Sequence, residues 1–67
     1  MAWSYKKLWI MLIEHDMKKT ELMRAAGITS NILSHLSKNE SVPLDALGKI
    51  CKLFHCELGD IVEYIED

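Results

Sequence analysis

Four polar side chains near the middle of the chain have types and spacing that suit hydrogen bonding to the edges of DNA bases. They recur at helical intervals, so one face of a helix would carry Asn31, Ser34, His35 and Lys38. Asparagine can pair bidentately with adenine, serine can donate or accept, and histidine can donate to a guanine acceptor. The pattern predicts a helix that enters the major groove of double-stranded DNA, although a helix that meets only solvent has a similar polar face.

The residues that precede the polar face indicate which elements would hold it at the surface. Gly27 ends a short helix expected over residues 19–26, because glycine adopts the left-handed conformation at a helix end without steric cost. Thr29 or Ser30 then caps the next helix, which is expected to reach about Lys38, by accepting a hydrogen bond from a free backbone N–H. A glycine turn between two short helices is the helix-turn-helix arrangement, in which the second helix lies in the groove.

Hydrophobic spacing predicts that the rest of the chain is helical as well. A first helix is expected over residues 4 to about 15 with Ser4 as its cap, and a fourth over residues 44–54 with Pro43 near its first turn. A short fifth helix is expected from Gly59 to about residue 64. Strand signals are weak, because the chain has no alternating β-branched run and no Asn-Gly turn. These patterns predict a compact all-α bundle of five helices.

Length and composition indicate one small globular domain that covers residues 1–67. Apolar residues make up 49% of the chain, which is normal for a folded protein. No apolar run approaches the roughly eighteen residues of a membrane-spanning helix. The short LWIMLI run near the N-terminus is not followed by a cleavage site, so we expect a cytoplasmic protein without a signal peptide or membrane segment.

Charge is distributed unevenly along the chain. The net charge of −2 argues weakly against a nucleic-acid partner. Residues 1–38 contain six Lys or Arg and three acids, for a sum of +3, whereas residues 39–67 contain two Lys and seven acids, for a sum of −5. The positive half contains the candidate polar face, which agrees with a partner that carries phosphates.

The cysteines and histidines support neither a metal site nor a catalytic centre. On one continuous helix, Cys51 and Cys56 would point away from each other, so no disulfide is expected, and free thiols fit a reducing compartment. The segment CKLFHC, which includes His55, matches no common zinc spacing. His15 and His35 lie in other expected helices, and no nucleophile, base and acid can be grouped. We therefore expect no enzymatic activity, no metal and no cofactor.

Two stretches carry a family resemblance. KKTELMRAAGITSNILSHLS resembles the motif of the Cro/C1-type (XRE-like) helix-turn-helix repressors, and LGKICKLFHCELGDIVEY resembles the end of the small single-domain subgroup of Gram-positive bacteria. The resemblance covers nearly the whole chain, from Leu8 to Tyr64. It implies a lambda-repressor-like domain and a sequence-specific transcriptional regulator that binds double-stranded DNA. It also implies a homodimer on a palindromic operator, without a small-molecule ligand.

The resemblance implies a set of site residues, position by position. The start of helix two contacts a phosphate in the family, the first positions of helix three reach bases and backbone, and two positions one turn later face the groove. The loop after helix three contacts the second strand's backbone. The implied base-reading residues are Thr29, Ser30, Asn31, Ser34 and His35. The implied phosphate contacts are Lys19, Lys38, Asn39 and Ser41.

The chain departs from the family pattern in its supporting positions. Many members pair an arginine late in helix one with a glutamate ending helix three, and Leu12 and Ser37 stand there instead. Losing both partners together leaves no stranded charge. Met23 replaces a small alanine between helices two and three, which would move those helices slightly apart. Asn39 replaces a glycine and tolerates the same backbone conformation, whereas Lys19 replaces a glutamine and keeps a donor for phosphate.

A second function stays open on the sequence alone. The acidic C-terminal half, with its IVEYI segment, could dock another regulator, a toxin or polymerase, which would make the chain a protein-interaction module. Apolar residues near the termini are candidates for a dimer surface, and they are equally compatible with ordinary core contacts. These residues are Trp3, Trp9, Val62, Tyr64 and Ile65.

Overall fold

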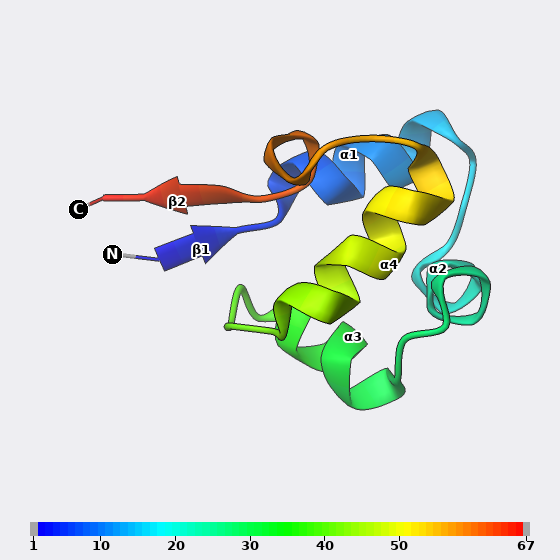
Figure 1. Cartoon of the computed structure of the whole chain (residues 1–67), viewed down its shortest axis with the longest axis horizontal. Helices are drawn as coiled ribbons and strands as arrows, with labels where there is room; N and C mark the ends of the chain where they lie inside the picture. The colour runs from blue at the N-terminus through cyan, green and yellow to red at the C-terminus, as the bar shows by residue number, and fades with distance from the viewer. Residues whose placement is uncertain (1, 67) are drawn as a thin grey trace.

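A computed structural model describes residues 2–66, and its elements form a helical body with a short sheet at one side (Figure 1). The two terminal strands lie side by side and extend from the body, while α4 crosses its centre (Figure 1). The expected domain runs over residues 1–67, of which positions 1 and 67 lie outside the described residues. The elements in chain order are β1 (Ala2–Ser4), α1 (Lys6–Glu14), α2 (Lys19–Ala26), α3 (Ser30–Ser37), α4 (Leu44–Phe54), a 3-10 turn (Leu58–Asp60) and β2 (Glu63–Ile65).

The helix-turn-helix segment has the predicted bounds. Helix α2 ends before Gly27, whose φ of 74° is the left-handed conformation that stops a helix. Thr29 then caps α3, and its hydroxyl oxygen accepts a hydrogen bond from the backbone N–H of Ile32 at 3.2 Å. The cap is therefore Thr29, one of the two expected residues. Helix α4 begins directly after Pro43, also as expected.

The prediction of a fifth helix is wrong, and the fold is not strictly all-α. Among residues 2–66 there are four α-helices, and the last segment forms one 3-10 turn followed by a strand. Strand β2 pairs antiparallel with β1, with Trp3 opposite Tyr64. Their rings meet edge to face with centroids 5.0 Å apart. A helix of six residues is marginal alone, whereas pairing adds backbone hydrogen bonds and an aromatic contact between residues that favour strands.

The same pairing corrects the start of the first helix. Ser4 ends β1 and does not cap α1, which begins at Lys6 with Tyr5 in the capping position. The Ser4 hydroxyl still accepts a long hydrogen bond of 3.4 Å from the Lys6 backbone N–H. The expected cap therefore lies next to the helix, but the backbone before it is extended because it belongs to the sheet.

The hydrophobic core joins all four helices and the segment after the 3-10 turn. Leu36 of α3 is fully buried, as expected, whereas Leu33 is only partly buried. Leu44, at the start of α4, is 71% exposed although its spacing matches the buried face. The buried residues are Tyr5, Leu8, Leu12, Leu22, Ile28, Leu36, Ala46, Leu47, Ile50 and Ile61.

The two cysteines lie together, contrary to the argument that they point apart. Helix α4 ends at Phe54, and His55 takes a left-handed conformation with φ of 54°. The chain therefore folds back, and the Cys56 N–H donates to the Cys51 carbonyl at 3.1 Å. Both thiols are free. Burial, together with the hydrogen-bonded Cys51 thiol and the Asp60 charge, raises the pKa of Cys56.

Two further observations bear on the sequence expectations. Within residues 2–66, no three His, Cys, Asp or Glu side chains are grouped so that they could hold a metal ion. The helices of the described chain are too short or too polar to cross a membrane.

Tyr5 connects the start of α1 to the loop after α3. Its ring is 2% exposed, and its hydroxyl donates a hydrogen bond of 2.7 Å to the backbone carbonyl of Glu40. Its backbone N–H donates a longer bond of 3.4 Å to the Asn39 side-chain oxygen. Burial raises the pKa of Tyr5, since the charged phenolate is poorly solvated there.

Tyr5 should make the domain sensitive to alkaline pH. Because the pKa of Tyr5 is higher in the folded chain, its contribution to stability is complete below the unfolded pKa of about 10 and is lost as pH rises through the folded pKa. We expect Tyr5→Phe to lose about 0.5–1.5 kcal/mol at neutral pH with the hydrogen bond, and to flatten the alkaline fall in stability. Urea unfolding from neutral to alkaline pH measures both the loss of stability and its dependence on pH. Tyr64→Phe, at an exposed tyrosine, is the control, and an unchanged slope in Tyr5→Phe would contradict the assignment.

Candidate nucleic-acid interface

Helix α3 presents the predicted polar row outward. Leu36 is fully buried and holds one side of α3 against the core. On the other side, Asn31, Ser34 and Lys38 are exposed, and the side chain of His35 is 42% exposed. The row is therefore free of contacts that would hide it from a duplex within the described monomer, and its members share one face.

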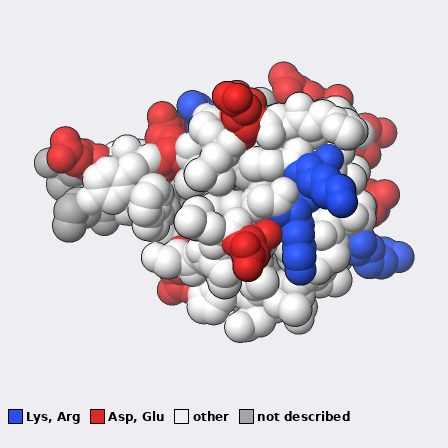
Figure 2. Space-filling model, viewed as in Figure 1, with Lys and Arg blue, Asp and Glu red and all other residues white. Residues whose placement is uncertain are grey.

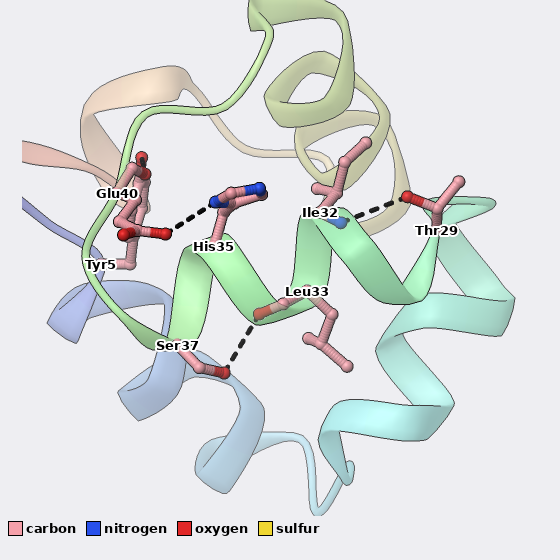
Figure 3. A network of polar contacts seen from close by, with 7 residues as sticks. All are labelled: Tyr5, Thr29, Ile32, Leu33, His35, Ser37 and Glu40. Carbon is pink, nitrogen blue, oxygen red and sulfur yellow. Dashed lines mark hydrogen bonds and ion pairs between the residues drawn. The ribbon is translucent and has the colours of Figure 1, made fainter.

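The first turn of α3 carries two of the predicted site residues in different roles. Thr29 is exposed, but its oxygen accepts the capping hydrogen bond from Ile32, so the hydroxyl hydrogen remains for an outside acceptor (Figure 3). Ser30 is the first residue of the helix and is exposed. Free N–H groups at such an N-terminus, together with the helix dipole, favour a phosphate.

Glu40 contacts His35 and was not among the predicted site residues. Its carboxylate oxygen lies 2.7 Å from Nδ1 of His35 (Figure 3). The contact arises because Asn39 adopts a left-handed φ of 58°, which turns the chain back along α3. An asparagine one position past the C-cap of a helix is the sequence signal that could have located this contact, since it permits that turn.

Lys19 lies where the family pattern places a phosphate contact, and its side chain is held by the protein. Its ammonium is 4.3 Å from the centroid of the Trp9 ring and donates to the Ser37 hydroxyl at 3.4 Å. Ser37 in turn donates to the Leu33 carbonyl at 3.1 Å. Leu12, the other position of the missing charge pair, is buried in the core. Leu12 thus packs in the core and Ser37 forms hydrogen bonds at the surface, and neither position leaves a buried charge without a partner.

The other predicted phosphate residues are placed unequally. Lys38 is exposed at the C-terminal end of α3, where its ammonium can reach beyond the helix. Asn39 turns its side-chain oxygen toward the backbone of Tyr5. Ser41 is exposed and lies on the rim of an apolar groove between β1 and α4. The structure therefore brings Lys38 to the polar row, while Asn39 and Ser41 also belong to contacts with the N-terminal segment.

Charged side chains are distributed unevenly over the surface of the protein. Figure 2 has the same orientation as Figure 1 and shows Lys and Arg gathered on the side of α2 and α4. Acidic residues occur along the terminal sheet, the upper rim and the right edge, with a further one near the centre, while uncharged residues predominate at the bottom, over α3 (Figure 2).

Comparisons with known proteins agree with this arrangement. Residues 7–67 match the family model described as a Cro/C1-type HTH DNA-binding domain. The chain is 42% identical over 60 residues to the uncharacterized HTH-type transcriptional regulator YozG of Bacillus subtilis (strain 168), which covers 87% of this chain and 71% of that protein.

A solved structure shares the whole architecture. The crystal structure of the transcriptional regulator VanUg, Form II, superimposes with a TM-score of 0.93 at 44% identity, over 98% of this chain and 88% of that chain. The superposition therefore covers nearly every residue of this chain. The paired helices α2 and α3, the outward polar row and the family match together show that the chain belongs to the Cro/C1-type helix-turn-helix family of DNA-binding domains.

Proposed function

We propose that the protein is a sequence-specific transcriptional regulator that binds double-stranded DNA and reads the major groove with α3. The single observation that carries the proposal is the exposed polar row of α3, on a helix whose start is fixed by Gly27 and Thr29. Side chains of this length approach base edges closely and offer directed donors and acceptors. The names of the two relatives, both transcriptional regulators, support the same proposal.

The proposal includes a homodimer on a palindromic operator. One domain of this size covers only a few base pairs, so useful affinity requires two recognition helices on half-sites about 10 base pairs apart. The surface for a second copy would be the terminal sheet together with the apolar groove beside it. Trp3 is 42% exposed and Leu58 is 42% exposed beside a groove of about 390 Å³. Three of the five candidate dimer residues are exposed, namely Trp3 and, at 47% and 46%, Tyr64 and Ile65.

Selection from a pool of random duplexes tests the proposal directly. We expect one enriched motif made of two inverted half-sites, and sedimentation of the complex should give two chains per duplex. Binding should weaken steeply with added salt, because phosphate contacts release counterions. Enrichment of no motif, together with binding that is equal for all duplexes, would contradict the regulator. A protein partner whose binding does not depend on α3 would favour the interaction module instead.

Lys38→Ala should separate phosphate binding from base reading. Lys38 is exposed at the end of α3, so its loss should weaken binding to all duplexes alike and reduce the salt slope by about 0.9, the value for one phosphate contact. Lys7→Ala is the matched control, because the Lys7 ammonium donates to the Gly59 carbonyl at the 3-10 turn. Titrations at several salt concentrations measure the slope. A change in preferred motif, or an equal slope change in Lys7→Ala, would exclude a phosphate role for Lys38.

A further inference from the structure

We propose that Glu40 is a positioning residue that orients the His35 ring and determines which base edge His35 can read. The inference rests on the proposed function and adds a specificity determinant outside the recognition helix. Glu40 belongs to the loop after α3, and its carboxylate is the partner of a side chain in the polar row. A carboxylate beside DNA also repels phosphate, so Glu40 would not be expected to increase the affinity for DNA and must act in another way.

The backbone at the end of α3 places the two side chains together. The Glu40 N–H donates to the His35 carbonyl at 2.9 Å, and the Asn39 N–H donates to the Leu36 carbonyl at 3.2 Å. These two bonds, with Asn39 in the left-handed conformation, make a Schellman motif. In that motif two side chains are in contact: one lies two positions after the C-cap and the other lies three positions before the C-cap. Here those residues are Glu40 and His35, and an ionic hydrogen bond replaces the usual apolar contact.

A second contact holds the loop in place from outside the helix. The Tyr5 hydroxyl donates to the Glu40 carbonyl at 2.7 Å, and the Tyr5 ring is buried in the core. Glu40 is thus fixed through its backbone N–H and its backbone carbonyl, so the position from which its side chain extends is defined. Both side chains are about half exposed, at 42% for His35 and 50% for Glu40. The pair therefore adds little to stability, and its consequence is orientation.

The carboxylate also decides where the ring carries its proton. An ionised carboxylate only accepts hydrogen bonds, so Nδ1 of His35 must be the donor at 2.7 Å. In the neutral ring, Nε2 then presents a lone pair, and it points away from Glu40 (Figure 3). An acceptor at this place matches the amino group of adenine or cytosine in the major groove. Donation from His35 to guanine, the sequence expectation, requires a ring protonated on both nitrogens.

The positioning claim can be measured in the free protein. Nitrogen-15 shifts of the imidazole, recorded in mildly alkaline buffer, distinguish the two neutral forms of the ring. We expect the form protonated on Nδ1 in the natural chain and a mixture in Glu40→Ala. Alanine keeps both backbone bonds and the Tyr5 contact, so the thermal unfolding midpoint should be nearly unchanged. A natural chain protonated mainly on Nε2, or an Ala variant with the same shifts, would overturn the proposal.

The base-reading consequence is tested by selection from random duplexes in the same buffer. We expect Glu40→Ala to reduce the preference for adenine or cytosine at one position by about two- to tenfold, the value of one hydrogen bond. Asp45→Asn, which removes an acidic charge at the start of α4, should leave that preference intact. In a His35→Ala background, Glu40→Ala should change nothing at this position, because Glu40 acts through the ring.

The outcomes separate this inference from the proposed function. The role of Glu40 would be overturned if the base preference survives Glu40→Ala, or if Glu40→Ala changes it equally in the His35→Ala background. Either result would leave the proposed regulator function unaffected. If the natural chain enriches no motif, the regulator and the base-reading consequence both fail, and the nitrogen-15 shifts still decide whether Glu40 orients His35.

Discussion

Leu36→Ala is expected to lower the free energy of unfolding by about 2–5 kcal/mol, the usual cost of truncating a buried leucine. Leu36 is fully buried and is the residue that holds α3 against the core. A domain of this size has a total stability of only about 3–10 kcal/mol. A substantial fraction of the variant should therefore be unfolded at physiological temperature, and urea unfolding followed by circular dichroism measures the loss.

A leucine at the surface provides the control for this prediction. Leu44 is 71% exposed in the first turn of α4, so Leu44→Ala should change the free energy of unfolding by less than about 0.5 kcal/mol. The comparison uses the same chemical change at two positions that differ in burial. A loss below about 1 kcal/mol in Leu36→Ala would mean that α3 is not held by this side chain.

Asn31→Ala should lower affinity for the selected duplex by about 5- to 150-fold and relax the base preference at one position. This range corresponds to the 1–3 kcal/mol by which a bidentate contact discriminates between bases. Asn31 is exposed in the first turn of α3, so the substitution should leave stability nearly unchanged. Competition titrations with duplexes altered at single positions measure both effects.

The pattern of losses distinguishes Asn31 from Lys38. Asn31→Ala should weaken the preferred duplex much more than random duplexes and keep the salt slope, whereas Lys38→Ala should weaken all duplexes alike and reduce the salt slope. An Asn31→Ala protein that retains its base preference would remove Asn31 from the recognition surface. Equal weakening on all duplexes would instead assign Asn31 to the phosphate backbone.

The helix-turn-helix could be predicted from the sequence because its signals act over a few residues. Gly27 stops α2 through its own backbone freedom, and Thr29 caps α3 through a bond to Ile32, three positions away. Once those ends are set, helical geometry alone turns Leu36 inward and Asn31 outward. The exposure of the polar row follows from the same geometry, although its contacts with bases remain a prediction.

The ends of the chain could not be predicted in the same way. Ile61, Val62 and Ile65 have spacing compatible with a helix, but β2 pairs with β1 from the opposite terminus. A local pattern contains no information about a partner some sixty residues away, and the Trp3–Tyr64 contact exists only after the chain has folded. The C-terminal residues lack a strong helical signal, and they therefore form a strand because β1 lies beside them for pairing.

The amino-acid sequence by itself determined the two short helices, the turn between them and the outward polar face, since capping and periodicity depend on residues within two helical turns. Only the tertiary structure decided the terminal sheet and the hydrogen bond from the Tyr5 hydroxyl to the Glu40 carbonyl. The left-handed Asn39 is enough to bring Glu40 beside His35, whereas Tyr5 reaches Glu40 from 35 positions away in the sequence. A hydrogen bond between such distant segments forms because packing brings them together, and packing is a property of the whole chain.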